Sequence, residues 1–204
     1  NVDGTRNVVE AALAAGARRA VVMSSNSPIG TNPTREHRFD EASPYRPYLG
    51  YGRSKQAMEE FVNDFHARFG LATVLVRAPW FYGPYQPPRQ TLFFEMVRDG
   101  KAPIVGDGGN MRSMSYTDNL VDGILLCAER PDAVGRTFWI SDARPYSMNE
   151  IVDTVEAMLE EAGIACKRGR LRLPALAGRF AYGVDAALQK IGVYQQKVHV
   201  LGEM

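Results

Sequence analysis

The residues of this chain best suited to chemistry are Ser25, Tyr51 and Lys55. Tyr51 and Lys55 are four residues apart, so on a helix they share one face and the ammonium lies near the phenol. A phenol normally loses its proton near pH ~10, and a fixed cation nearby favours the ionised form. Such a tyrosine can exchange a proton with a substrate hydroxyl near neutral pH. Ser25 ends an apolar run and can hydrogen-bond the same substrate oxygen.

The elements that must position these residues alternate between helix and strand. Apolar spacing predicts helices over residues 5–15 and 52–69, and short apolar runs predict buried strands over 19–24 and 71–76. The proline- and glycine-containing residues 26–50 predict a long loop, a feature that in compact domains is usually functional or disordered. This order is typical of the second half of a doubly wound parallel sheet of the Rossmann type, within the α/β class.

After residue 80 the pattern changes to shorter, mixed elements. The predicted helices cover 90–98, 117–129, 147–162 and 176–191, and the predicted strands cover 103–105, 111–116, 136–140 and 171–173. Ser147 and Glu150 have the spacing of a capping box. We therefore expect residues 1–80 to form the C-terminal half of a Rossmann domain, and residues 81–204 to be mainly a small mixed α/β substrate-binding lobe.

Four polar residues near element ends receive structural interpretations. Asp3 or Thr5 is expected to cap the first helix. Ser24 is expected to satisfy a backbone group at the end of its strand. Asp118 is expected to help cap the helix that begins near residue 117.

Composition limits the class of partner. The 204 residues carry a formal net charge of +1, which does not suggest nucleic acid or an anionic membrane as partner. The apolar runs fall short of the ~20 residues of a membrane span. We expect a small-molecule substrate, no nucleic acid, no membrane and a cytoplasmic location.

Metal, disulfide and serine-hydrolase sites are not predicted. The three histidines, His37, His66 and His199, lack metal-ligand spacing with one another or with the cysteines. Cys127 and Cys166 are expected to be reduced thiols. No Gly-x-Ser-x-Gly sequence surrounds a serine, which argues against a serine hydrolase built on Ser25.

The three chemical residues occur within five ordered blocks that resemble the extended branch of the short-chain dehydrogenase/reductase superfamily, the NAD-dependent epimerase/dehydratase family. The blocks are Asn-Val-x-Gly-Thr-x-Asn at 1–7, the serine-bearing strand at 21–25, Tyr-x-x-x-Lys at 51–55, Arg-x-Pro and Tyr-Gly-Pro at 77–84, and Gly-x-Gly with Arg112 and Tyr-Thr-Asp-Asn at 106–119. The resemblance covers residues 1–145 and is vague beyond about residue 165.

The resemblance implies roles for individual residues. It implies that Tyr51 is the general acid/base, and that Lys55 favours the ionised phenol and hydrogen-bonds the ribose next to the nicotinamide. It implies that Ser25 binds the substrate oxygen, and that Pro79 lies where the chain passes the nicotinamide ring. The implied cofactor is NAD or NADP.

Two residues bear on the substrate. Arg112 matches an arginine that sugar-nucleotide enzymes of the branch use on a diphosphate, and a solvated strand arginine is the alternative. Trp80 replaces the asparagine with which those enzymes contact substrate. Its large apolar face favours a less polar alcohol or ketone. The alternative is a core tryptophan.

Three functions follow from the resemblance. The first is hydride transfer on a secondary alcohol or ketone, the second a nucleotide-sugar epimerase or dehydratase, and the third a non-catalytic NAD(P)-sensing protein. An intact Ser25, Tyr51 and Lys55 argues against the third.

The resemblance also implies that the first half of the nucleotide-binding domain precedes Asn1. The glycine cluster at 106–109 is followed by a predicted strand, not a helix, so it fails the test for a phosphate-binding turn. We therefore expect residues 1–204 alone to bind NAD(H) weakly or not at all. The choice between NAD and NADP is normally made after the second strand, in the implied first half.

Members of the branch commonly form dimers through two helices, which correspond here to residues 5–15 and 52–69. The wide apolar face of the second helix, with its Met58–Val62 and Phe61–Phe65 pairs, supports a homodimer of the full-length protein. The alternative is that this face packs only on its own sheet. Val62 is the position at which a glutamate is expected to separate the subunits.

Overall fold

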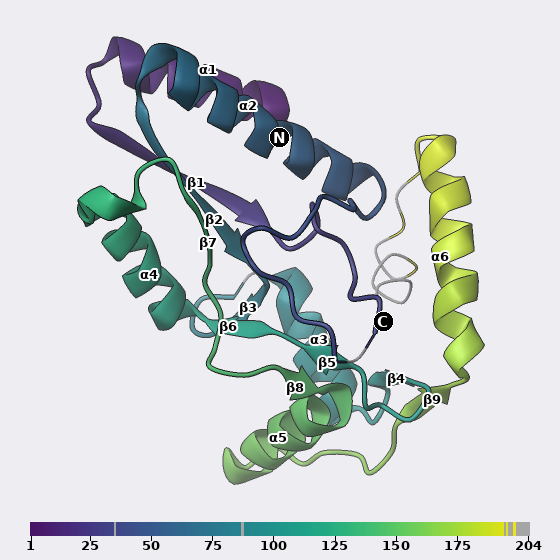
Figure 1. Cartoon of the computed structure of the whole chain (residues 1–204). Coiled ribbons are helices and arrows are strands. Elements are labelled where there is room, and N and C mark those ends of the chain that lie inside the picture. Colours follow the sequence, from purple (N-terminus) through teal and green to yellow (C-terminus); the bar gives the residue numbers. More distant parts are fainter. Residues whose placement is uncertain (35, 87, 194, 196–197, 199–204) are drawn as a thin grey trace. The chain divides into compact units, whose positions relative to one another are not determined.

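The computed structural model of this chain describes residues 1–34, 36–86, 88–193, 195 and 198 (Figure 1). It is an α/β structure that divides into two compact units. The first unit comprises Asn1–Tyr82 and Met114–Ala143, and the second comprises Gly83–Ser113 and Arg144–Met204. The chain therefore changes unit near the expected boundary at residue 80, but it then returns to the first unit over Met114–Ala143, which holds a further helix and two further strands.

The first unit is built on a parallel three-stranded sheet, as the sequence predicts. Its strands are β1 (Arg19–Ser25), β2 (Ala72–Ala78) and β7 (Thr137–Trp139), in the order β1-β2-β7. In the register of the sheet, Ser24 lies opposite Arg77, and Arg77 lies opposite Trp139. The carboxyl ends of the three strands thus meet at one edge.

Helices cover both faces of this sheet because successive β2 side chains point to opposite sides. Val74 and Val76 pack with residues of α4 (Thr117–Glu129). Leu75, on the other face, packs with Met58 and Val62 of α2 (Leu49–Phe69).

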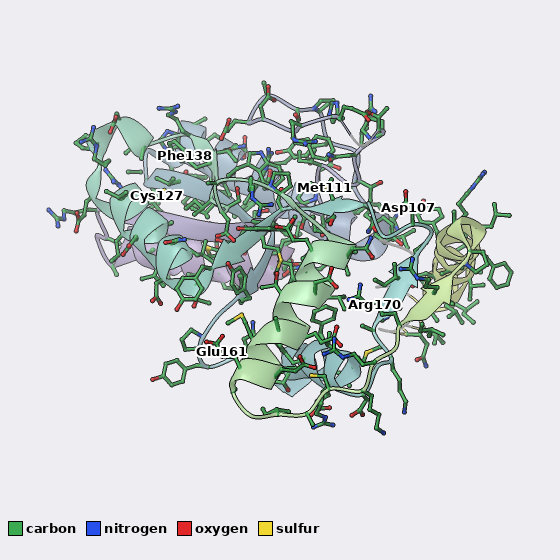
Figure 2. All side chains as sticks on the ribbon, turned by 90° about the horizontal axis from the view of Figure 1, so that it is seen from below. Asp107, Met111, Cys127, Phe138, Glu161 and Arg170 are labelled. Atoms are coloured by element: carbon green, nitrogen blue, oxygen red, sulfur yellow. The ribbon has the colours of Figure 1, made fainter. Side chains whose placement is uncertain are left out.

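A second helix, α1 (Val2–Ala14), covers the same face as α2, through Val9 packed with Phe65 and Leu71. Figure 1 shows α1 and α2 side by side. Figure 2 shows Phe138 of β7 near Cys127 of α4, on the opposite face. A 3₁₀ turn, η1 (Pro131–Ala133), follows α4. This layering is the doubly wound arrangement.

Two predictions of helix capping are wrong. The first helix begins at Val2, so Asp3 and Thr5 lie inside it, and Asn1 is the N-cap without a side-chain capping bond. The N-cap of α4 is Tyr116, also without a side-chain capping bond. Asp118 lies in the first turn instead, where its negative charge interacts favourably with the helix dipole.

The second unit contains short strands and three helices in its described part. The helices are α3 (Pro88–Arg98), α5 (Met148–Glu161) and α6 (Ala175–Lys190), and the strands are β4 (Pro103–Val105), β5 (Met111–Arg112), β8 (Tyr146–Ser147) and β9 (Leu171–Leu173). β4 pairs with β9 in parallel, and β5 pairs with β8 in antiparallel. Ile104 and Val152 share a core with Val97. The predicted cap of α5 is confirmed, because Ser147 Oγ accepts a 3.1 Å hydrogen bond from the Glu150 N–H.

The strand predicted over residues 111–116 is in fact two strands. β5 belongs to the second unit, whereas β6 (Met114–Tyr116) belongs to the first and pairs in parallel with β3 (Trp80–Tyr82). The two strands are separated at Ser113, where the chain passes from one unit to the other. Within the described ranges, none of the helices combines the length and apolar character that crossing a bilayer requires.

Candidate functional site

Helix α2 and its N-cap contact the backbone just before and just after Ser25, the last residue of β1. Lys55 Nζ donates a 2.9 Å hydrogen bond to the carbonyl oxygen of Met23. The Tyr48 N–H, at the N-cap of α2, donates a 3.1 Å bond to the carbonyl oxygen of Ser27. Because these two contacts flank Ser25, they bring the first turns of α2, which carry Tyr51 and Lys55, to the carboxyl end of β1.

Two glycines allow this close approach. A Cβ on Gly52 would lie 2.6 Å from the Ser27 carbonyl oxygen. Gly30 has a φ of +85°, and a Cβ there would lie 2.2 Å from the carbonyl oxygen of Arg46. The Arg46 N–H also donates a 3.0 Å bond to Pro28 O. The two ends of the long loop therefore pack against each other beside the site.

The two hydroxyl groups of the site differ in their surroundings. Ser25 is half-buried, and its Oγ lies 3.1 Å from Asn26 Oδ1 and 3.2 Å from Ser27 Oγ. Tyr51 is 44% exposed, and its hydroxyl makes no hydrogen bond to any residue that the structure describes. The serine hydroxyl is thus held by its neighbours, while the tyrosine hydroxyl has no hydrogen-bond partner among the described residues.

Two opposing effects act on the pKa of Lys55. Burial lowers the pKa of Lys55, and the negative charge of Glu59, one turn along α2, opposes that shift. The Met23 carbonyl takes one of the three ammonium donors. Lys55 Nζ also lies 3.8 Å from Met58 Sδ, a weak acceptor.

Directly behind the site lies a buried polar cluster that the sequence reasoning missed. We call it the Glu59 cluster: Ser24, Tyr45, Glu59 and Arg77. Arg77 donates to both oxygens of the Glu59 carboxylate, at 3.1 Å from Nε and 2.8 Å from Nη2. Ser24 Oγ donates to Oε1 at 2.5 Å, and Tyr45 Oη donates to Oε2 at 2.8 Å. The interpretation of Ser24 as a backbone cap is therefore wrong, because its hydroxyl binds a side chain.

The environment of the cluster keeps its donors protonated. Burial and the hydrogen bond to Glu59 raise the pKa of Tyr45 to about 12. Burial lowers the pKa of Arg77, but the hydrogen bond and charge of Glu59 outweigh it, so the pKa is raised overall. Two features of the sequence could have indicated this cluster: a glutamate four residues after Lys55 on the helix, and an arginine at the end of an apolar run.

The remaining predicted residues lie in different places. Pro79 is buried directly after Ala78, the register partner of Ser25. Trp80 is half-buried at the start of β3, opposite Met114. Arg112 lies in the second unit, on β5 opposite Tyr146. The structure thus brings Pro79 and Trp80 to the strand ends near Ser25, whereas it describes Arg112 as part of the other unit.

The residues at this edge fit the nicotinamide-ribose half of a dinucleotide. Tyr51 presents an exposed hydroxyl, and Lys55 presents an ammonium donor, next to the carboxyl ends of parallel strands, where α/β folds bind such ligands. In the part of the chain that the structure describes, the glycine cluster at 106–109 joins two strands and not a strand to a helix. No group of metal-ligating side chains occurs among the described residues, and His199 lies outside them.

The family model described as the NAD dependent epimerase/dehydratase family matches residues 1–141. This chain belongs to that family. The match covers the whole sheet of the first unit together with Ser25, Tyr51 and Lys55. The resemblance drawn from the five sequence blocks is therefore confirmed.

The curated relatives are longer than this chain. An uncharacterised protein, y4nL of Sinorhizobium fredii, is 55% identical over 206 residues, which cover 100% of this chain and 58% of that protein. The 3beta-hydroxysteroid-dehydrogenase/decarboxylase isoform 1 of Arabidopsis thaliana is 30% identical over 214 residues, covering 98% of this chain and 47% of that protein. The chain spans about half the length of these relatives.

A solved structure shares the fold. DesIV, a dTDP-glucose 4,6-dehydratase from Streptomyces venezuelae with NAD and TYD bound, matches with a TM-score of 0.71 and 28% identity. The match covers 85% of this chain and 53% of that one. The Rossmann-type interpretation of the sheet is confirmed.

Proposed function

We propose that the full-length protein is an NAD(P)-dependent oxidoreductase that transfers hydride between its cofactor and a secondary alcohol or ketone. The observation that carries the proposal is the pair of backbone contacts by which α2 flanks Ser25, since it gathers Ser25, Tyr51 and Lys55 at one sheet edge. The NAD-dependent family supports the choice of cofactor.

Each protein residue has one task in this mechanism. The bound nicotinamide supplies the hydride chemistry. Tyr51 takes the proton from the substrate hydroxyl during oxidation and returns it to the carbonyl oxygen during reduction. Ser25 orients that oxygen and stabilises the charge that builds on it. Lys55 would hold the ribose, and Pro79 would line the site of the nicotinamide ring.

The substrate is proposed from Trp80 and from the relatives. A half-buried indole at the strand ends offers an apolar face and one donor, which suits a less polar alcohol or ketone. The 30% identical Arabidopsis protein, named a hydroxysteroid dehydrogenase, supports this class. The second candidate, a nucleotide-sugar epimerase or dehydratase, is favoured by Arg112 and by the 28% identical dehydratase.

The two candidates differ in what happens to the cofactor. We expect the full-length protein to accumulate reduced cofactor and ketone when it is mixed with NAD⁺ or NADP⁺ and a 3β-hydroxysteroid. With dTDP-glucose we expect no product. Conversion of dTDP-glucose without net cofactor reduction would establish the second candidate instead, and the Tyr51→Phe variant serves as the inactive control for both reactions.

We also propose that the full-length protein is a homodimer through α1 and α2. The expectation that Val62 faces the partner is wrong, because Val62 is fully buried against Leu75. The exposed large aliphatic and phenylalanine side chains on these helices are instead Val8, at 66%, Leu13, at 37%, and Phe69, at 51%.

A charge at an exposed position of this face tests the dimer. We expect Val8→Glu to give a folded monomer in light scattering, because a carboxylate would be buried without a partner in the interface. Leu126→Glu is the matched control, since Leu126 is similarly exposed, at 57%, but lies on α4, the helix on the other face of the sheet. A wild-type protein that is monomeric at micromolar concentration would show the proposal to be wrong.

A further inference from the structure

Two consecutive residues of β1 are bonded to two residues of α2 that are one helical turn apart. The carbonyl of Met23 accepts from Lys55 Nζ at 2.9 Å, and the hydroxyl of Ser24 donates to Glu59 at 2.5 Å. We call these two hydrogen bonds the two-bond link. Ser25, which follows directly on β1, takes no part in it.

The link fixes the helix along the strand. Apolar contacts between α2 and β1 are not directional, so they tolerate small sliding movements of the helix. Hydrogen bonds at two positions constrain both the distance and the alignment of the donors and acceptors. The link therefore sets the position of Tyr51 and Lys55 relative to Ser25, which sits one residue beyond its end.

Glu59 can hold Ser24 because its own carboxylate is immobilised. Glu59 is 0% exposed, and Arg77 and Tyr45 together donate three hydrogen bonds to it. Arg77 also lies 5.6 Å from the centroids of the Tyr45 and Trp139 rings. The carboxylate is thus held at both oxygens by Arg77 of β2, and at Oε2 also by Tyr45 of the loop.

Stability alone does not account for such a cluster. A buried ion pair costs desolvation energy, and well-packed apolar residues of similar size are often as stable or more so. The directional bonds that a carboxylate offers are what an apolar pair lacks.

We propose that Glu59 and Ser24 are positioning residues, which hold Ser25 at the end of β1 in register with Tyr51 and Lys55. The inference rests on the proposed function, because it assigns these residues to the same catalytic centre. Neither residue touches the substrate in this account. Their effect is on the geometry of the three catalytic residues.

The test removes one hydroxyl from each side of the same carboxylate in the full-length protein. Ser24→Ala cuts the link, whereas Tyr45→Phe, the matched control, removes a donor from the far oxygen and leaves the link intact. We expect Ser24→Ala to lower kcat about 10-fold with KM and cofactor affinity unchanged within about twofold. We expect Tyr45→Phe to change kcat by no more than about twofold, because Arg77 still holds both oxygens of the Glu59 carboxylate.

The result that overturns the proposal is a Ser24→Ala variant whose kcat stays within about twofold of the wild type. Equal losses of kcat in the two variants would overturn it as well, because they would indicate a purely structural cluster. Tyr51→Phe is measured alongside. If Tyr51→Phe is fully active, the proposed function itself fails. If Tyr51→Phe is inactive while Ser24→Ala is fully active, only the positioning role fails.

Discussion

Replacing Tyr51 by phenylalanine is expected to lower turnover by on the order of 10²-fold or more, while the cofactor remains bound. The substitution removes only a hydroxyl that is exposed and makes no hydrogen bond to any described residue, so the fold loses no contact. The ribose is held by Lys55 in this account, and cofactor affinity should therefore persist. Steady-state kinetics and calorimetric titration with NAD(H) measure the two quantities separately.

A matched tyrosine separates this effect from the general loss of a phenol. Tyr182 on α6 has a similar exposure, at 46% against 44% for Tyr51. We expect Tyr182→Phe to leave turnover within about twofold of the wild type. Near-normal turnover in Tyr51→Phe would show that another group moves the proton.

The second large effect is on stability. Glu59→Leu is expected to lower the free energy of unfolding by about 3–5 kcal/mol, because it leaves the Arg77 guanidinium buried without its anion. Arg77 is 3% exposed and cannot reach water without rearrangement. The double variant Glu59→Leu/Arg77→Met should recover more than half of that loss, since it removes both charges. Urea unfolding followed by circular dichroism measures both values.

An exposed ion pair on the same helix provides the comparison. Arg68 and Asp64 lie 3.1 Å apart, with their side chains 64% and 57% exposed. Breaking that pair with Arg68→Met should change stability by no more than about 0.5 kcal/mol. If Glu59→Leu and Arg68→Met destabilise the protein equally, the buried pair is not held as the structure describes it.

The helices and strands of the first unit could be predicted because the apolar residues in each follow the pattern of a helix or of a buried strand. Helix α4 occupies residues 117–129 as predicted, and β1 and β2 differ from their predictions by one or two residues at their ends. The five ordered sequence blocks were specific enough to indicate the family, and they identified Ser25 at the end of a strand and Tyr51 near the start of a helix.

Periodicity indicates which side of an element is buried but not what covers it. For that reason the sequence could not distinguish contact of Val62 with a partner subunit from the packing that the structure shows, which is against Leu75 of its own sheet. For the same reason the Glu59 cluster could not be predicted from the sequence. Its members are brought together by the register between Ser24 and Arg77 and by the fold of the loop that carries Tyr45. Residues paired over such long distances in the chain have no characteristic spacing by which the sequence could reveal them.

The most direct test of the central claim is a crystal structure of the full-length protein with NAD(H) bound. The claim is that Ser25, Tyr51 and Lys55 form one catalytic centre around the nicotinamide end of the cofactor. The account predicts that Lys55 Nζ lies within hydrogen-bonding distance of a ribose hydroxyl, and that the Ser25 and Tyr51 hydroxyls converge on one site beside the nicotinamide ring. A cofactor whose nicotinamide lies away from β1, with Lys55 making no contact with the ribose, would contradict it.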